Sequence, residues 1–290
     1  PEKIEHSLLE HMKKYGGNPD NWTGANRVDV ALHCIYRACL LKDRQTLIES
    51  VNSAFSTLSY TRNNEGFQYD GSFLQHDLQL YIGGYGEVMI DGITKLAMYV
   101  RGMECELCGE KIKILSNFIR FTYLNTIRNN YMLFNVLGRS ISRPNALLNF
   151  NYKKIVYRML FLDPAHCKDY KNVLDNFNSV NIKPFHAHYY CGDYTLHVRP
   201  NYIFDVRMVS DRTVRCESVN NENLKSYFLS DGCTGIVSTG KEYYNIFPLW
   251  DWTRLPGVTS PLLDTIPFKN RKTWQMRGIT KFSGGVSDSI

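Results

Sequence analysis

Apolar residues recur every three or four positions through the first 160 or so residues, a spacing typical of amphipathic helices. Asp43 can cap one of these helices, whose apolar residues run from Leu47 to Leu58. The other predicted helices span residues 26–42, 87–100, 110–129 and 145–162. Successive antiparallel helical hairpins, arranged as a bundle or a toroid, are the expected result.

The periodicity changes to two after about Phe185, where β-branched and aromatic residues dominate between recurring turn residues. Strands are predicted over residues 194–198, 202–206 and 213–215. Pro164 and several asparagines indicate a connection between the two halves. We therefore predict an α+β protein in three parts: helical residues 1–165, a linker over residues 166–184, and the start of an antiparallel β domain over residues 185–290.

The two ends of the sequence suggest a piece of a longer protein. Ile4, Leu8 and Met12 lie at helical spacing from the outset, and the β part stops at Ile290 without a closing element. The lack of a signal peptide at Pro1 therefore carries little weight.

Composition and charge exclude several classes of protein. The chain is 43% hydrophobic, which is ample for a packed core. Its net charge of +6 comes from 34 basic and 28 acidic residues, a mild excess that suits a polyanionic ligand. No basic run reaches five residues, so a nucleic-acid-binding arm is not indicated. No apolar stretch is long enough to span a bilayer, so contact with a membrane would need a segment outside this sequence.

The eight cysteines are too dilute for a disulfide scaffold. Cys105 and Cys108 form a single CxxC pair, which needs a second pair of ligands to hold zinc; His186, His188 and Cys191 are candidates for it. A local disulfide or two loop thiols is the favoured interpretation. No metal and no cofactor are predicted.

The most unusual stretch runs from Gly66 to Gly92, rich in glycine, aromatic and polar residues. It places His76 and Tyr85 in a loop, with glycines on both sides of the tyrosine that permit close approach of a ligand. An imidazole and a phenol on such a loop are plausible proton-transfer partners. The alternative is an ordinary tight turn with buried aromatic residues.

Two other polar clusters carry candidate binding residues. In TGANRVD, Asn26 lies at a helix start, where unpaired backbone N–H groups favour an anion; the alternative is that it only caps the helix. In ESVNNENLK, Glu217 can hold an arginine in place and Asn220 can bind sugar hydroxyls.

Arg139 and Arg143 lie four residues apart in GRSISRP. Pro144 disfavours helix at Arg143, so the segment is expected to be extended or irregular, with both guanidinium groups on one side. Two such groups suit a carboxylate or sulfate ligand. The alternative is a solvated or acid-paired surface turn.

Taken together, TGANRVD, DGSFLQH, YIGGYG, GRSISR and ESVNNENLK resemble polysaccharide lyase family eight in order and spacing, from about Gly16 to Ser260. The resemblance implies an incomplete α/α toroid followed by an antiparallel β-sandwich, both truncated. It also implies an active centre of Asn26, His76, Tyr85 and Arg139, supported by Arg143, Glu217 and Asn220. Trp22 is the candidate for the aromatic patch that stacks on sugars in this family.

The implied function is cleavage of chondroitin or hyaluronan by β-elimination, with His76 as base and Tyr85 as acid and possible shared base. The alternative is a glycosaminoglycan-binding viral envelope or attachment protein with little turnover, since the cysteine, asparagine and tyrosine content resembles lyase-like envelope proteins of baculovirus virions. A nucleic-acid or structural protein is supported by charge alone, and no carboxylate pair indicates a glycoside hydrolase. The expected location is extracellular or in a virion envelope.

Overall fold

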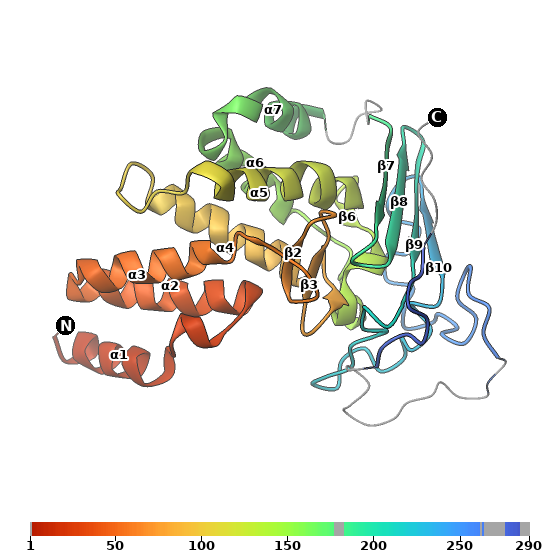
Figure 1. Cartoon of the computed structure of the whole chain (residues 1–290), viewed down its shortest axis with the longest axis horizontal. Coiled ribbons are helices and arrows are strands. Elements are labelled where there is room, and N and C mark those ends of the chain that lie inside the picture. The colour runs from red at the N-terminus through yellow and green to blue at the C-terminus, as the bar shows by residue number, and fades with distance from the viewer. Residues whose placement is uncertain (1, 177–182, 262, 264–275, 285–290) are drawn as a thin grey trace.

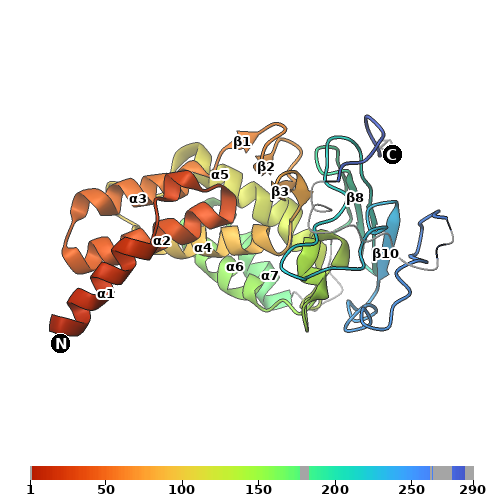
Figure 2. The same cartoon turned by 90° about the horizontal axis from the view of Figure 1, so that it is seen from below.

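The computed structural model describes residues 2–176, 183–261, 263 and 276–284. Helices form one end of an elongated molecule and a four-stranded sheet forms the other, as two perpendicular views show (Figures 1 and 2). The predicted α+β class is confirmed: a helical part comes first and an antiparallel part follows.

The helical part is a set of packed hairpins. Helix α2 packs against α3 and α4, α4 packs against α6, and α6 packs against α7. Asp43 caps α3 as predicted, because its carboxylate accepts the Thr46 N–H at 3.0 Å. The helices are α1 (Glu2–Tyr15), α2 (Gly24–Leu41), α3 (Arg44–Ser56), α4 (Tyr85–Tyr99), α5 (Gly109–Asn117), α6 (Asn151–Leu162) and α7 (Cys167–Asn176).

The antiparallel sheet has the order β10-β9-β8-β7. Residues alternate between buried and partly buried along β8 and β9, so the period of two in the sequence marks a sheet with one face against the core. Its strands are β7 (Phe185–Tyr189), β8 (Tyr194–Arg199), β9 (Tyr202–Arg207) and β10 (Cys233–Val237).

The predicted loop before Tyr85 is wrong in two respects. Four short strands lie within it, and Tyr85 is the first residue of α4 with Gly84 before it at a positive φ of 53°. His76 follows the third of these strands, in the tight turn that leads to the fourth. The strands are β1 (Tyr60–Thr61), β2 (Gly66–Gln68), β3 (Phe73–Gln75) and β4 (Gln79–Leu80).

The predicted helix over residues 110–129 is also wrong at its C-terminal end. It ends as α5 at Asn117, continues as a π-helix over Phe118–Tyr123, and then gives way to the hairpin β5 (Ile127–Arg128) and β6 (Tyr131–Met132). Asn129 and Asn130 have positive φ angles of 48° and 67°, which a two-residue hairpin turn requires.

Two further boundaries differ from the sequence expectation. The helix predicted from residue 145 begins only at Asn151, because the Asn149 side chain accepts the first free N–H groups of α6. Residues 167–176 of the predicted linker form α7, which Asp163 anchors by accepting hydrogen bonds from Tyr170 and Ser116. Residues 177–182 of that linker lie outside the described residues.

The third predicted strand, residues 213–215, is wrong as well. Val214 forms only an isolated bridge with Arg277, and the strand that completes the sheet is β10. Contacts between the two parts are extensive. Arg128 of β5 donates to the carbonyl groups of Ser238 and Pro200, which joins the helical part to the sheet.

Candidate active site

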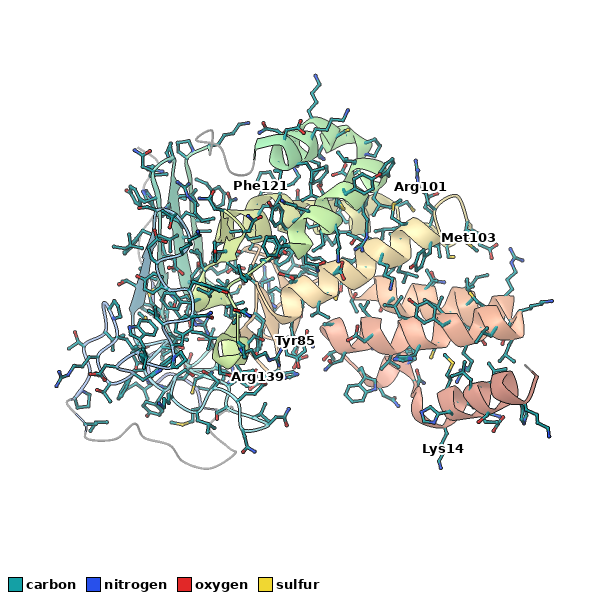
Figure 3. The ribbon with its side chains drawn as sticks, turned by 180° about the vertical axis from the view of Figure 1, so that it is seen from behind. Lys14, Tyr85, Arg101, Met103, Phe121 and Arg139 are labelled. Carbon is teal, nitrogen blue, oxygen red and sulfur yellow. The ribbon has the colours of Figure 1, made fainter. Side chains whose placement is uncertain are left out.

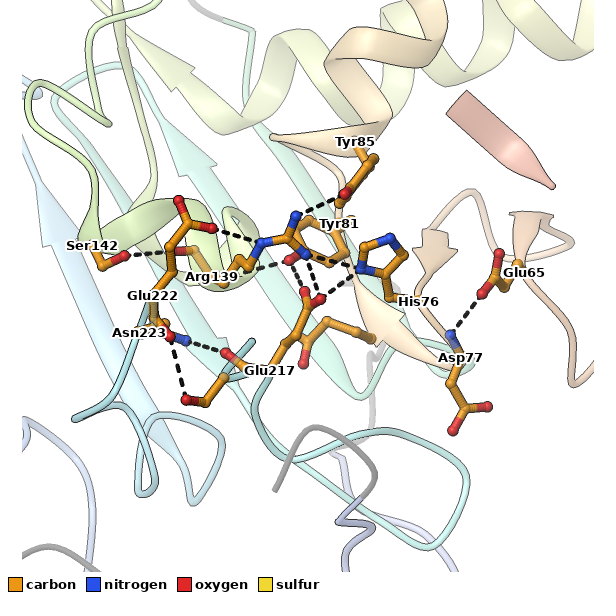
Figure 4. A network of polar contacts seen from close by, with 12 residues as sticks. Glu65, His76, Asp77, Tyr81, Tyr85, Arg139, Ser142, Glu217, Glu222 and Asn223 are labelled. Atoms are coloured by element: carbon orange, nitrogen blue, oxygen red, sulfur yellow. Dashed lines mark hydrogen bonds and ion pairs between the residues drawn. The ribbon is translucent and has the colours of Figure 1, made fainter. Parts of the chain in front are cut away.

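A polar cluster lies where the start of α4, the β3–β4 turn and the loops beside the sheet meet (Figure 4). Tyr85 and Arg139 lie at this junction, at the opposite end of α4 from Arg101 and Met103 (Figure 3). The members of the cluster come from three separate segments: His76, Tyr81 and Tyr85 from the first, Arg139 from the second, and Glu217 and Glu222 from the third.

Arg139 is the centre of the cluster. It lies in a 3₁₀ helix, Gly138–Ser142, and is only 6% exposed. Its Nε donates to Glu222 at 2.8 Å, its Nη2 donates to the Tyr85 hydroxyl at 2.8 Å, and its Nη1 donates to Glu217. One guanidinium group therefore joins two carboxylates to the phenol oxygen.

The imidazole of His76 is held by Glu217. Its Nδ1 lies 2.5 Å from Glu217 Oε1, and the ring centroid lies 4.4 Å from that of Tyr85. An ionised carboxylate only accepts hydrogen bonds, so we assign the hydrogen of neutral His76 to Nδ1. Arg139 Nη1 approaches the same nitrogen at 2.9 Å but cannot donate to it in that tautomer. The lone pair of His76 is then on Nε2, which has no partner among the described residues.

The contacts within the cluster shift the pKa values of Glu217 and Tyr81. Burial raises the pKa of Glu217, but hydrogen bonds from His76 and Tyr81 and the positive charge of Arg139 outweigh it and leave that pKa below its ordinary value. Burial, followed by the charge of Glu217, raises the pKa of the Tyr81 phenol well above its ordinary value. Tyr81 therefore stays neutral and donates to Glu217 while it accepts the Arg139 backbone N–H at 3.1 Å.

The turn that carries His76 is held in an uncommon conformation. His76 and Asp77 have φ angles of 55° and 64°, in the left-handed region that few residues other than glycine adopt. The Asp77 N–H donates to Glu65 at 2.7 Å, and the Asp77 carboxylate accepts two hydrogen bonds from Arg277 at 2.7 Å. Glu65 also accepts the hydroxyl of Thr23, the residue before α2. Thr23, Glu65, Asp77 and Arg277 thus form a chain of contacts, here called the positioning chain.

Asn26 is brought to the same region through the start of α2. The Ala25 N–H donates to Gln75, the residue before His76, at 3.1 Å. Asn26 is partly buried, and its amide makes no hydrogen bond within the part of the chain that the structure describes. It does not cap α2, since Thr23 holds the N-cap position. Trp22, just before this helix, is 48% exposed and open to a ligand.

The guanidinium groups of Arg139 and Arg143 lie on the same side, as predicted, but the backbone between them is not extended. Both donate to Glu222, with Arg143 Nε at 2.7 Å and Nη2 at 3.1 Å. The residues before Arg143 form a 3₁₀ helix, which corrects the extended prediction, and Arg143 itself is extended as Pro144 requires. Arg143 is thus paired with an acidic residue, as the alternative described, and Arg139 also reaches Tyr85. A contact of Arg143 with a ligand stays a prediction.

Glu217 holds an arginine, as the sequence suggested, whereas Asn220 makes no hydrogen bond to the cluster among the described residues. Asn220 is exposed and has a φ of 57°. The sequence reasoning missed Tyr81 and Glu222. Both residues lie in stretches that the sequence singles out, Tyr81 in Gly66–Gly92 and Glu222 in ESVNNENLK. Nothing in the sequence pattern distinguishes them from their neighbours in those stretches.

The zinc alternative is not supported. Cys105 and Cys108 are free thiols in the loop between α4 and α5, at the end of the helical part away from the strand β7 that carries His186 and His188 (Figure 1). Within residues 2–176, 183–261, 263 and 276–284, no group of three or more histidine, cysteine or acidic residues is arranged to hold a metal ion.

Two family models match the chain. The N-terminal alpha-helical domain of polysaccharide lyase family 8 matches residues 2–176, and the super-sandwich domain of the same family matches residues 184–289.

Individual relatives agree with these matches. Chondroitinase-AC from Pedobacter heparinus is 43% identical over 295 residues, covering 100% of this chain and 42% of that protein. A hyaluronate lyase, HylB, from Enterococcus faecalis is 25% identical and covers 84% of this chain and 28% of that protein. This chain therefore spans less than half the length of the curated relatives it matches.

Solved structures show the same fold. A structure of chondroitinase AC lyase with oligosaccharides has a TM-score of 0.92 and 44% identity, and covers 98% of this chain and 42% of that chain. A xanthan lyase from Paenibacillus, at 24% identity, has a TM-score of 0.74 over 89% of this chain and 28% of that chain.

Proposed function

The chain belongs to polysaccharide lyase family 8, and from this premise we propose that it carries the catalytic centre of a lyase that cleaves chondroitin or hyaluronan by β-elimination. One observation supports this most strongly: Arg139 connects the phenol of Tyr85 to the Glu217 carboxylate that orients His76. An acid, a base and a cation in direct contact are what the elimination requires.

The reaction removes the proton on C5 of a uronate, beside a carboxylate. That proton is very weakly acidic while the carboxylate keeps its full charge, so the site must stabilise the negative charge that develops there. We assign this role to the amide of Asn26, which makes no hydrogen bond in the part of the chain that the structure describes. Asn26 follows Ala25, whose N–H donates to Gln75, the residue before His76. Trp22 offers an exposed ring on which a sugar can stack.

His76 is the proposed base. Glu217 fixes Nδ1–H, which leaves the Nε2 lone pair free to take the C5 proton. As the C5–H bond breaks, its electrons form the C4=C5 double bond, and the C4–O bond of the glycosidic linkage breaks. The positive imidazolium is then compensated by Glu217.

Tyr85 is the proposed acid, because its hydroxyl proton can pass to the departing glycosidic oxygen. Arg139 donates to the Tyr85 oxygen at 2.8 Å and lies over its ring, with the guanidinium carbon 5.3 Å from the centroid. It can therefore stabilise the phenolate left behind. The same contact would serve a Tyr85 that also takes part as base, so a shared role stays part of the proposal.

The competing functions fit the site less well. Glu217 and Glu222 are a carboxylate pair, but arginines bind both and the pKa of each lies below its ordinary value, whereas a glycoside hydrolase needs one carboxyl group that stays protonated. A protein that only binds glycosaminoglycan has no need of an oriented imidazole against a phenol.

The proposed partner is an acidic polysaccharide, and the proposed place of action is outside the cell, where such polymers occur. The relatives described above are bacterial, so they do not support the alternative that this chain is a viral envelope protein. No helix of the described residues is long and apolar enough to cross a membrane.

The deciding experiment follows the ultraviolet absorbance of the unsaturated uronate when the intact protein is mixed with chondroitin or hyaluronan. Product formation supports the lyase. Retention of both polymers on the protein without any unsaturated product would instead favour the binding module.

The positioning chain gives a first mutational prediction. Glu65→Ala removes the acceptor shared by Thr23 and Asp77 and frees both the His76 turn and the start of α2. Because small misplacements of reacting groups are costly, kcat should fall roughly 10- to 100-fold. Glu65→Gln, which keeps one acceptor oxygen, should recover most of this loss.

The matched control is Glu110→Ala, which removes only an exposed ion pair with Lys113 and should leave kcat unchanged. Equal activity of Glu65→Ala and the parent would show that the positioning chain does not hold His76 in place for the reaction.

A further inference from the structure

A cavity of about 570 Å³ is lined in part by Arg143. Arg143 lines this cavity and also donates to Glu222, so the cavity adjoins the candidate active centre. Its volume is within the range of about 300–1,000 Å³ that is usual for ligand sites. The lining residues with side chains suited to binding a ligand are Arg143, Asn221, Asn223, Lys225, Phe247 and Trp252.

The lining suits a sugar. Phe247 and Trp252 are buried and give the cavity an apolar wall, and the Trp252 indole is held by its hydrogen bond to the Phe247 carbonyl at 3.0 Å. Asn223 donates to the Glu217 carbonyl at 2.8 Å, which ties the cavity rim to the residue that orients His76 (Figure 4). Asn221 is exposed at the same rim, and its amide has no hydrogen bond among the described residues. An apolar wall combined with a few amide groups is typical of ligand pockets, and both kinds of group can contact a sugar ring.

Lys225 is the uncompensated charge of this region. Glu217 and Glu222 already bind Arg139 and Arg143, so three cations face two carboxylates. The Lys225 ammonium is exposed and makes no ion pair or hydrogen bond with any residue that the structure describes. A strongly hydrated point charge of this kind binds a compact anion well.

We propose that this cavity binds the hexosamine next to the cleaved uronate, and that Lys225 contacts a sulfate ester on that hexosamine. The inference rests on the proposed function for the class of polymer. In chondroitin the uronate to be cleaved is followed by a neutral hexosamine ring, whose only charged substituent is a sulfate. Lys225 lines the same cavity as Arg143, and the nearby carboxylates are bound to Arg139 and Arg143, so its charge is available for that sulfate.

The test compares chondroitin 4-sulfate and 6-sulfate with unsulfated chondroitin as substrates of the intact protein. Lys225→Met keeps the length of the side chain and removes its charge. It should raise KM for at least one sulfated polymer roughly tenfold, the loss of one charge-assisted contact. KM for unsulfated chondroitin and kcat for all three should stay within about twofold of the parent. Lys225→Arg should restore the sulfated KM, and Lys241→Met, an exposed lysine outside the cavity lining, should change none of these values.

Two results would overturn the proposal. An equal rise in KM for unsulfated chondroitin would mean that Lys225 meets a uronate carboxylate, and unchanged KM values throughout would mean that it meets no ligand.

A parent protein that forms no unsaturated product would count against the lyase and not against the subsite. In that case the affinity of the protein for a sulfated chondroitin tetrasaccharide is measured by calorimetry. An affinity of Lys225→Met about tenfold weaker than that of the parent supports the subsite, and equal affinities overturn it.

Discussion

Tyr85→Phe is expected to lower the formation of unsaturated product by at least ~10²-fold, the lower end for general acid–base catalysis, with polymer affinity nearly unchanged. The substitution keeps the ring that contacts His76 and removes only the hydroxyl that accepts from Arg139 and would donate to the leaving oxygen. The measurement is initial rate by ultraviolet absorbance, together with retention on immobilised chondroitin. Tyr157→Phe removes the hydroxyl of a tyrosine that is 57% exposed and serves as the control.

The partner substitution His76→Ala should also cut turnover, and the two effects should combine to less than their product, because both residues serve one step. Asn26→Ala should lower the rate through lost stabilisation of the developing charge. If activity survives Tyr85→Phe, Tyr85 is not the general acid, although the fold and the family membership still hold.

Arg139→Ala is expected to lower both activity and stability. Activity should fall about 10²–10³-fold, the effect of losing one preorganised donor to a developing oxyanion, here the Tyr85 oxygen. Stability should fall by about 3–5 kcal/mol, because buried Glu217 loses its arginine partner, while Glu222 keeps Arg143. Arg101→Ala, an exposed arginine at the far end of α4 (Figure 3), should change neither.

The stability loss of Arg139→Ala should depend on pH in a defined direction. In the parent the pKa of Glu217 lies below its ordinary value, so its ionised form stabilises the fold above the carboxyl range. Without Arg139 that pKa rises, and the Glu217 carboxylate, which has lost its arginine, destabilises the fold wherever it is ionised. The difference in unfolding free energy should therefore be largest near neutral pH and shrink as pH falls and Glu217 becomes protonated. Chemical denaturation at neutral and acidic pH measures it, and a difference that does not change with pH would show that Glu217 is not the group that depends on Arg139.

Periodicity predicted much of the fold because it reflects burial directly. The helical spacing and the Asp43 cap, and later the alternation along β8 and β9, correspond to faces that are buried in the structure. The misses have local causes. The two asparagines at 129 and 130 turn a predicted helix into a hairpin, and Gly235 conceals β10, since any larger side chain there would collide with the Asp205 carboxylate.

The sequence indicated which residues would form the candidate site, but not which of them would contact one another. His76, Tyr85, Arg139 and Glu217 are chemically distinctive, and the resemblance to a family placed them in order. Which arginine reaches the phenol, and which carboxylate reaches the imidazole, depends on three-dimensional packing of segments far apart in the chain. Glu222 shows the limit most clearly: a glutamate in a polar loop has no sequence signal that it will bind two arginines at once.

The positioning chain and its neighbours also bear on how the protein acquires activity. His76 meets Glu217 across 141 residues and Asp77 meets Arg277 across 200. Contacts of such high sequence separation carry a large loop-closure entropy and form late in folding. Helices α2 to α4 can assemble from nearby residues while the imidazole still has no partner. We therefore expect the proposed catalytic arrangement to be completed only when the last part of the chain packs against the helices.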